Sequence, residues 1–425
     1  MTLYSPEIID RITRRGVQEI ISRDEFVRML QEGKPLRLKM GFDPSRPDIH
    51  LGHVVGLRKL HQLQELGHQV ILVVGDWTAQ IGDPSGQSAT RPTLTHDEVI
   101  ANAESYLRQF FKVVDRDRTQ VVWQSEWFGK FTLADVLKLT GRFTVAQFLE
   151  RDDFAKRFQE HRPIAITELL YPLLQAYDSV EIRADVEFGG TDQMFNLLVG
   201  RELQGMMGQK PQQCVLMPIL VGTDGVQKMS KSLDNYVGVE EPPNDMYGKL
   251  MSLPDQLIPS YFNFLTDTSE EELSAISQDL ATDAVNPMQL KKRLAREITA
   301  QFHDGPAADA AQQHFERVVQ RRDLPEDMPD FEFRPYTGQT YTSGPREILD
   351  EPTGAPAAAL PMLLSAAGLA SSNNEAKRLL SQGAIYLIRA TGEPQKLSAD
   401  YPVTNLQSGD VLRRGNRRFV RLVES

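Results

Sequence analysis

Short apolar runs alternate with helical patterns over the first half of the chain. A β-rich run over 36–42 is followed by apolar residues at helical spacing over 51–60, and Gly67 ends that helix. The next run, 69–77, is apolar on both faces, as in a buried parallel strand. This β-α-β unit predicts an α/β fold with a doubly wound, Rossmann-like parallel sheet.

The alternation continues to about residue 220. Thr95 and Glu98 match a capping box, which predicts a helix from this point to about residue 112. The other predicted elements are strands over 120–123, 185–188 and 213–220, and helices over 133–150, 165–178 and 193–203.

The second half of the chain changes character twice. Between 242 and 322 strand signals are few and helical runs dominate, so we expect a helical domain. Between 324 and 356 six prolines favour an extended linker. We therefore expect a Rossmann-like catalytic domain, a helical domain, a linker and a small α+β domain, over 1–235, 236–323, 324–356 and 357–425.

Composition places the chain among ordinary globular proteins. With 425 residues, 40% of them hydrophobic and 25% charged, it excludes wholesale disorder and collagen-like repeats and favours several domains. No apolar run reaches the roughly 18 residues of a membrane helix, and the N-terminus lacks the apolar core of a signal peptide. The single cysteine, Cys214, cannot form an internal disulfide. We expect a cytoplasmic protein.

Charge is unevenly distributed. The net charge of −11 argues against a surface that binds nucleic acid everywhere. Residues 357–425, however, contain nine Lys/Arg and five Asp/Glu, a balance of +4, so the rest of the chain carries −15. A local basic patch is therefore predicted in the C-terminal domain.

The first segment with candidate chemistry lies between the first strand and the helix after it. His50 and His53 share one helix face there, and Gly52 leaves room for a flat group such as a nucleobase. The carboxyl end of a parallel strand and a helix N-terminus together favour phosphate. The HExxH spacing of a zinc site is absent. Taken alone, two surface histidines at a helix start would explain this segment as well.

A second segment, 225–232, follows the last core strand. Lys228 and Lys231 lie three residues apart in a predicted loop, where two ammonium groups can pair with a polyphosphate. Taken alone, the lysines would be explained by a solvated loop.

Together the two segments resemble the signature motifs of the class I aminoacyl-tRNA synthetases, His-x-Gly-His at 50–53 and Lys-Met-Ser-Lys-Ser at 228–232, in the expected order. A Walker phosphate loop and a GxGxxG fingerprint are both missing. The resemblance implies ATP as a substrate with Mg²⁺, no tightly bound cofactor and no metal site of the protein's own. It implies that the catalytic groups are His50, His53, Lys228 and Lys231.

A third segment indicates the amino acid. Tyr171, Gln175 and Asp178 share one face of a predicted helix, where a phenol, an amide and a carboxylate converge. Tyrosine needs such a wall, with an acceptor for its hydroxyl and polar partners for its ammonium. An amphipathic helix with a polar stripe is the alternative. The chain resembles tyrosyl-tRNA synthetases over nearly its whole length.

That resemblance implies specific contacts. Asp83, Tyr171 and Gln175 would hold the substrate ammonium, and Asp178 the phenol hydroxyl. The other residues implied at the tyrosine site are Asp43 and Gln193, the latter near the carboxylate. Those implied at the ATP site are Gly190 and Asp192 on the ribose, with Ser45, Gly52, Arg91, Lys228 and Lys231.

Two positions depart from the best-known branch of that family. Lys39 stands where that branch has a tyrosine that also contacts the phenol hydroxyl, so Asp178 would carry more of the recognition. Gln87 stands where it has a lysine that grips pyrophosphate, although Arg91 is kept. The phosphate clamp therefore has one charge fewer.

The C-terminal segment resembles the small S-four-type RNA-binding domain through 368–372, 375–380 and 383–384. A basic face of this kind suits phosphate contacts on folded RNA. The residues implied are Lys377, Arg378, Arg413, Arg414, Arg417 and Arg418. A merely solvated basic tail is the alternative. The family further implies tRNA as partner, with the helical domain on its anticodon side, and a homodimer.

Two other functions compete. A tryptophanyl enzyme would share the architecture, although the wall formed by Tyr171, Gln175 and Asp178 suits a phenol better than an indole. An RNA-binding regulator on a catalytically silent synthetase scaffold would not need intact His50 and Lys231.

Overall fold

The computed structural model describes residues 3–45, 48–85, 95–320, 328–333, 340–341, 348–349, 359–389, 394–415 and 418–424. Its chain forms two compact units, Met1–Ala308 and Asp309–Ser425. In the described ranges no helix is long and apolar enough to cross a membrane.

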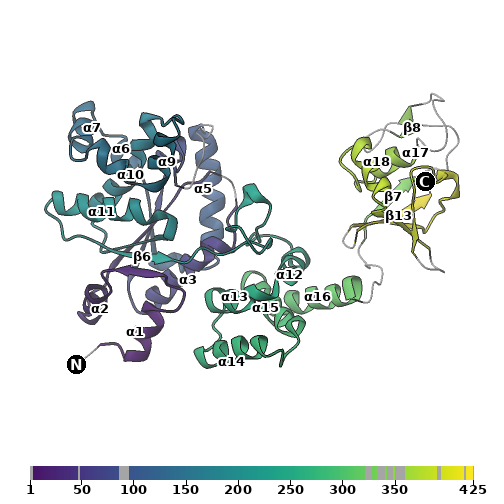
Figure 1. The fold of residues 1–425 in the computed structure, drawn as a ribbon, viewed down its shortest axis with the longest axis horizontal. Helices are drawn as coiled ribbons and strands as arrows, with labels where there is room; N and C mark the ends of the chain where they lie inside the picture. Colours follow the sequence, from purple (N-terminus) through teal and green to yellow (C-terminus); the bar gives the residue numbers. More distant parts are fainter. Residues whose placement is uncertain are drawn as a thin grey trace. The chain divides into compact units, whose positions relative to one another are not determined.

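The first unit is built on a six-stranded sheet (Figure 1) with the order β1-β6-β5-β2-β3-β4. All neighbours are parallel except β1, which pairs antiparallel with β6. The strands are β1 (Glu19–Ile21), β2 (Arg37–Phe42), β3 (Gln69–Val74), β4 (Thr119–Trp123), β5 (Val186–Gly190) and β6 (Gln213–Met217). The chain winds from β2 to β3 and β4, and then returns to β5 and β6 on the other side. The point of reversal lies between β2 and β5, which is where doubly wound sheets bind ligands.

Helices connect these strands and confirm the α/β class. Their bounds are α1 (Pro6–Thr13), α2 (Arg23–Gln31), α3 (Leu51–Glu65), α4 (Thr78–Ile81), α5 (His96–Phe110), α6 (Ser125–Phe128), α7 (Leu133–Thr140), α8 (Val145–Phe148), α9 (Asp152–Gln159), α10 (Ile166–Glu181) and α11 (Met194–Met206). The predicted capping box is present, because the side chains of Thr95 and Glu98 each bond the other's backbone N–H at the start of α5.

Several predicted elements differ in extent. The helix expected over 133–150 is two helices, because α7 ends at Thr140 with Gly141 as its C-cap, and Thr144 caps the start of α8. The strand expected over 213–220 ends at Met217, since Pro218 cannot donate to a ladder. The sequence patterns also missed α9 and the N-terminal elements α1, β1 and α2.

The rest of the first unit is helical, as predicted for this part of the chain. The helices are α12 (Pro243–Met251), α13 (Ile258–Leu265), α14 (Glu270–Ala281), α15 (Pro287–Phe302) and α16 (Gly305–Phe315), which runs past the end of the unit. The sheet and helices α12 to α15 belong to one compact unit, so the domain boundary at 235/236 stays a prediction.

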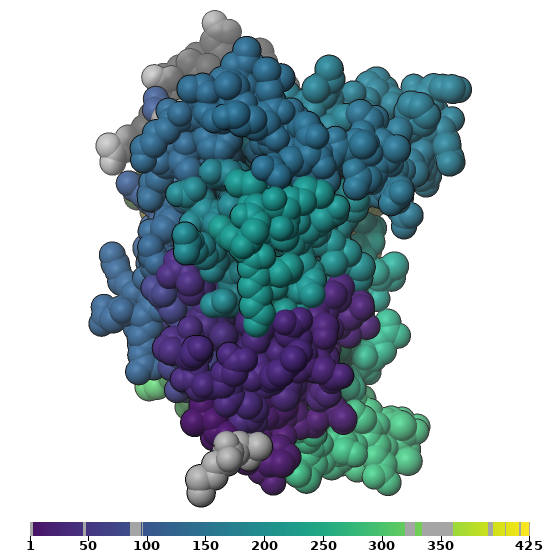
Figure 2. Space-filling view, turned by 90° about the vertical axis from the view of Figure 1, so that its left-hand side faces the viewer, coloured from purple at the N-terminus to yellow at the C-terminus, as the bar shows by residue number. Residues whose placement is uncertain are grey.

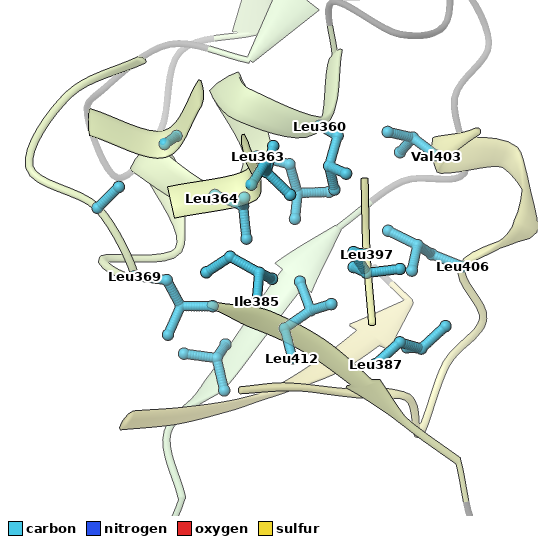
Figure 3. Close-up of a cluster of buried hydrophobic side chains, with 14 of the residues drawn as sticks. Leu360, Leu363, Leu364, Leu369, Ile385, Leu387, Leu397, Val403, Leu406 and Leu412 are labelled. Atoms are coloured by element: carbon cyan, nitrogen blue, oxygen red, sulfur yellow. The ribbon is translucent and has the colours of Figure 1, made fainter. Parts of the chain in front are cut away.

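The second unit is a small α+β domain. Its sheet has the order β11-β10-β12-β13-β7, and β7 is parallel to β13. Figure 3 shows its core, in which Leu360 and Leu363 of α17 pack with apolar side chains of the strands, including Ile385 and Leu412. The elements are α17 (Ala359–Ala366), α18 (Asn373–Ser381), β7 (Asp330–Phe333), β10 (Ile385–Ile388), β11 (Gln395–Lys396), β12 (Val411–Arg414) and β13 (Arg418–Glu424).

The linker predicted over 324–356 is wrong at Asp330–Phe333. These residues form β7, and Phe333 is buried in the core of the second unit. The prolines around these four residues predicted an extended linker, and the strand was too short to give a strand signal of its own. Two shorter strands, β8 (Thr340–Tyr341) and β9 (Ile348–Leu349), also pair within this stretch. The other residues of the predicted linker, apart from 328–329, lie outside the described residues.

Candidate active site

The two signature segments meet near the carboxyl ends of β2 and β5. His50 is bridged to Gly238 in antiparallel fashion, which holds the chain that follows the lysine loop beside the start of α3. Lys231 Nζ donates to the main-chain oxygen of Asp48 and lies 3.4 Å from its carboxylate. Lys228 Nζ lies 3.1 Å from Asp192 Oδ2, just after β5. Side chains far apart in sequence therefore form one basic cluster.

The two histidines are fixed by the start of α3. His50 is the N-cap residue, and its Nδ1 accepts a hydrogen bond from the N–H of Gly52 at 3.2 Å. His53 Nδ1 accepts one from the N–H of His50, also at 3.2 Å. A backbone N–H only donates, so each Nδ1 must be unprotonated and the ring proton sits on Nε2. Both rings therefore direct an N–H donor away from the helix end.

Their environment keeps both imidazoles neutral. Burial lowers the pKa of His53 to about 4, and the charges of Lys231 and Lys228 add to this effect. Burial and the neighbouring His53 and lysines lower the pKa of His50 further still. At neutral pH the pair offers hydrogen bonds without positive charge, and the lysines supply the charge.

Two glycines are required by close packing around this cluster. A Cβ at Gly52 would lie 2.9 Å from His50 Nδ1 and would displace the capping ring. A Cβ at Gly190 would lie 2.6 Å from Asp192 Oδ1. Both positions keep backbone accessible where the predicted nucleotide site lies.

The lysine loop is anchored by a residue that the sequence patterns missed. Asn235 Oδ1 accepts from the N–H of Ser230 at 2.8 Å, and its Nδ2 donates to Lys228 O and Asp224 Oδ2. A Cβ at Gly222 would lie 2.3 Å from this Nδ2. No spacing rule identifies Asn235, since it acts by folding the loop onto itself.

The buried phenol of Tyr171 and the partly buried carboxylate of Asp43 form one end of the predicted tyrosine pocket. Tyr171 Oη donates to Asp43 Oδ2 at 2.9 Å, and Thr78 Oγ1 donates to Asp43 Oδ1 at 2.7 Å. Burial and the carboxylates of Asp43 and Asp83 raise the pKa of Tyr171 well above its usual value, so its phenol stays protonated. These carboxylates are suited to hold an ammonium group.

Gln193 joins this end of the pocket to the start of α11. Its Nε2 donates to Asp83 Oδ2 at 2.7 Å, and its Oε1 accepts from Asn196 at 2.9 Å. Ser85 Oγ accepts from Arg151, which also bonds Asn196. Sequence reasoning missed Arg151, which lies before α9, a helix that was itself not predicted.

Asp178 lies at the other end of the pocket, two turns after Tyr171 on α10. Its side chain is almost fully buried, and its Oδ2 accepts from Gln124 Nε2 at 2.9 Å. Its Oδ1 has no hydrogen-bond partner among the described residues. Burial raises the pKa of Asp178 to about 7, although the Lys39 ammonium and the Gln124 amide act in the opposite direction. A buried acceptor of this kind fits a phenol hydroxyl.

Ser45, Gln87 and Arg91 are the remaining residues of the predicted nucleotide site. Ser45 is exposed in the turn after β2, where its N–H donates to Asp43 O. Arg91 and Gln87 lie outside the described residues.

The basic residues predicted to bind RNA divide into two groups. Lys377, Arg378 and Arg418 are exposed. Arg413 is buried with its guanidinium 4.5 Å from the Tyr386 ring centre, and Arg414 donates to Leu369 O and Glu375 Oε1. The prediction is therefore wrong for Arg413 as a surface contact, because the strand β12 turns it inward. Arg417 lies outside the described residues.

The chain is similar to known proteins over most of its length. The family model described as "tRNA synthetases class I (W and Y)" matches residues 31–320. The tyrosine–tRNA ligase of Dehalococcoides mccartyi is 55% identical over 415 residues, covering 98% of each chain. That of Thermotoga maritima is 47% identical over 419 residues, again covering 98% of each.

Solved structures show the same fold. A C-terminally truncated mitochondrial tyrosyl-tRNA synthetase of Aspergillus nidulans matches with a TM-score of 0.61 and 21% identity, covering 74% of this chain and 93% of its own. A tyrosyl-tRNA synthetase of Archaeoglobus fulgidus complexed with L-tyrosine matches with a TM-score of 0.59 and 24% identity, covering 72% and 99%. Identity over nearly the whole length of the curated relatives is decisive: this chain belongs to the tyrosine–tRNA ligases, class I enzymes that use ATP to attach tyrosine to tRNA in two steps.

Proposed function

We propose that the basic cluster and the predicted tyrosine pocket together carry out the first step of tyrosine attachment, the formation of tyrosyl-adenylate. The tyrosine carboxylate attacks the α-phosphate of ATP in line, which gives tyrosyl-adenylate and pyrophosphate. The 3'-terminal adenosine of the tRNA then takes the tyrosyl group. The attacking carboxylate is ionised at neutral pH, so the first step needs no general base and depends on positioning and charge stabilisation.

The observation that carries this proposal is the meeting of the two signature segments around the start of α3. His50 and His53 direct Nε2–H donors outward, and Lys228 and Lys231 reach the same region from the opposite loop. Lys228 is held by an oxygen of Asp192, and Lys231 by oxygens of Asp48. When ATP binds, oxygens of its polyphosphate would replace these aspartate oxygens as partners of the lysines. Four donors so arranged would stabilise the negative charge that develops on departing pyrophosphate.

We assign the nucleotide's other contacts by family resemblance and local geometry. Gly190 and Asp192 would hold the ribose, and Gly52 would admit the base, with Ser45 and Arg91 nearby. Mg²⁺ would enter with ATP and stabilise charge on its phosphates. In the described part of the chain, no group of three or more His, Cys, Asp or Glu residues could hold a metal ion.

We assign the contacts to the tyrosine substrate from the polar groups at the two ends of the predicted pocket. Tyr171, Asp83 and Gln175 would bind the ammonium, supported by Asp43, which accepts the Tyr171 hydroxyl. Gln193 would lie near the carboxylate. Asp178 would accept the phenol hydroxyl through its Oδ1, which supports tyrosine over tryptophan as the substrate.

Amino-acid-dependent exchange of pyrophosphate into ATP, without tRNA, tests the first step. We expect exchange with tyrosine and none above background with phenylalanine or tryptophan. Exchange with tryptophan would overturn the assigned pocket, and silence with all three would overturn the assigned catalytic cluster.

We propose that the second unit binds tRNA through exposed basic side chains. Lys377 and Arg378 lie on α18 and Arg418 begins β13, and all three are exposed. Point charges of this kind contact phosphate and position an RNA without reading its sequence.

Replacing Lys377, Arg378 and Arg418 together by alanine should weaken tRNA binding and reduce its salt dependence. Each lost phosphate contact lowers the slope of log K against log salt by about one. Filter binding over a salt series measures this effect. Pyrophosphate exchange without tRNA is the control and should stay unchanged; a fall in both activities would contradict the separate role of this surface.

We propose that the chain forms a homodimer through an apolar face of the first unit. Five large apolar side chains from α7, α8, α9 and α10 are at least 60% exposed, namely Leu133, Leu137, Val145, Phe158 and Ile166. Figure 2 shows this segment (blue) adjoining the region of α11 (teal) on one face. Apolar groups concentrated in this way indicate an interface. Sedimentation equilibrium at micromolar protein should give twice the chain mass, and a monomer would contradict the proposal.

We propose that the protein works in the cytoplasm. Its single cysteine, Cys214, is free and buried and cannot form an internal disulfide, which fits a reducing compartment. Fractionation of the source cells tests this location.

A further inference from the structure

A buried ion pair is bonded to α10, the helix that carries Tyr171, Gln175 and Asp178. Lys39 on β2 and Glu187 on β5 are both fully buried, and Lys39 Nζ lies 2.9 Å from Glu187 Oε1. Lys39 is one of the two residues that depart from the best-known branch of the family. Desolvation offsets much of the attraction in such a pair, so stability alone does not explain it. Its role is better sought in the groups that it holds.

The pair is bonded to the helix that carries the pocket wall. Lys39 uses its three donors on Glu187, the Gln175 main-chain oxygen and Ser179 Oγ, the latter two at 2.7 Å. Glu187 accepts from Gln175 Nε2 at 3.1 Å, from Ser179 Oγ at 3.2 Å and from Gln212 Nε2. Gln175 and Ser179 flank Asp178 on α10, so the pair holds the wall on both sides of this carboxylate.

These bonds determine what the wall offers to a substrate. Because the amide NH₂ of Gln175 is bonded to Glu187, its Oε1 is the atom left to accept a hydrogen bond from an ammonium. Lys39 also acts on Asp178 through its charge: it lowers the pKa of that carboxyl, whereas Glu187 raises it.

Other groups face Asp178 as well. Tyr171 on the same helix interacts with it electrostatically. Two uncharged side chains also act on it: Gln124 donates a hydrogen bond to Oδ2, and Trp127 lowers the pKa of the carboxyl. Burial has the largest effect on the pKa of Asp178, and Lys39 and Glu187 are the charged groups that shift it in opposite directions.

We propose that Lys39 and Glu187 are a positioning pair for tyrosine selectivity: Glu187 orients the Gln175 amide, and Lys39 keeps Asp178 able to accept the phenol hydroxyl. Neither side chain touches the substrate. In the best-known branch, a tyrosine at this position contacts the phenol hydroxyl of the substrate. Here Lys39 bonds Gln175 and Ser179 of α10 instead, so Asp178 recognises the phenol hydroxyl without help from this position. This inference rests on the proposed roles of Asp178 and Gln175.

Two isosteric substitutions in the full chain test the pair by the sign of their effects. The measured quantity is kcat/KM for tyrosine in pyrophosphate exchange, from about pH 5.5 to 8.5, where loss of the Asp178 charge gives an acid limb. Lys39→Met removes a positive neighbour and should move this limb up by about one pH unit. Glu187→Gln removes a negative neighbour and should move it down by a similar amount. The KM for ATP should not change.

Two further variants serve as controls. The double variant Lys39→Met/Glu187→Gln should return the limb close to that of the natural protein, because the two charge changes oppose each other. Lys59→Met is the matched control, since Lys59 is another buried lysine, and burial with nearby arginines lowers its pKa to about 7. It should leave the limb in place; if the limb vanished in this variant, it would belong to Lys59 and the inference would be overturned.

If the ion pair only stabilises the fold, the three variants should show a different pattern of activity. Both single variants would lose activity toward tyrosine and ATP alike, and the double variant would lose most. If Lys39→Met does not fold, Glu187→Gln decides alone, because a limb at or above its original pH overturns the pair. If Asp178→Asn leaves the ratio of tyrosine to phenylalanine activity unchanged, the proposed pocket itself fails. If Asp178→Asn abolishes that ratio while no pair variant moves the limb, only this inference fails.

Discussion

Replacing Lys231 by alanine should slow tyrosyl-adenylate formation about 10²–10³-fold, the loss that follows removal of one donor from a site that stabilises developing charge. The Lys231 ammonium lies against Asp48, two residues before His50, the N-cap of α3. It is therefore placed to follow the pyrophosphate as charge develops, and not to hold the tyrosine side chain. The equilibrium affinity for tyrosine should stay nearly unchanged.

Single-turnover measurement of adenylate formation separates these two quantities. Tyrosine affinity is measured by equilibrium dialysis on the same preparation. Lys291→Ala is a matched control, because Lys291 also pairs with a carboxylate, that of Asp255, but on the helical part of the first unit. An unchanged single-turnover rate in Lys231→Ala, or an equal fall in Lys291→Ala, would remove Lys231 from the catalytic cluster.

The sequence predicted the parts of this site that follow from regular geometry. The β-α-β pattern over 36–77 located the turn of the chain where His50 and His53 lie, and the helical spacing of Tyr171 and Asp178 placed both on one wall. Helical and strand periodicity are local properties, so a single sequence reveals them.

The parts that escaped prediction depend on contacts between distant segments. Glu187 and Gln212 are buried polar residues on or beside strands. No local pattern shows that Glu187 bonds Gln175 of α10, or that Gln212 bonds Glu187. Asn235 anchors the lysine loop through bonds that exist only once that loop is folded. Arg413 was predicted to be a surface charge, but β12 pairs with β10 so that its guanidinium lies over the Tyr386 ring. Charge and composition do not reveal which face of a strand a residue will take.

The same dependence on distant contacts explains the error in the predicted linker. Proline-rich composition favours extended chain, but extended chain is also what a sheet edge accepts. Asp330–Phe333 pairs in parallel with the last strand of the chain, roughly 90 residues later, and buries Phe333. A short edge strand between prolines can therefore be identified only when the strand with which it pairs is known.

Replacing Asp178 by asparagine should have the largest effect on specificity. The asparagine keeps the shape of the side chain but loses the ionised acceptor, and it presents an NH₂ donor where the phenol hydroxyl needs an acceptor. We expect tyrosine kcat/KM in pyrophosphate exchange to fall by at least about 10²-fold, with little change for phenylalanine. Tyrosyl-tRNA synthetases are the standard example of such discrimination, at about 10⁵-fold without editing, and that magnitude is taken over from them.

The pH dependence gives this prediction its sharpest form. Burial raises the pKa of Asp178 to about 7, so lowering the pH through this value protonates the carboxyl and removes the ionised acceptor. Tyrosine kcat/KM should therefore fall below about pH 7, and this limb should be absent in Asp178→Asn. Asp410→Asn is the matched control, because Asp410 is a buried carboxyl of the second unit, bonded to the Gln407 N–H and paired with Arg389. An acid limb that persists in Asp178→Asn would place phenol recognition on another group.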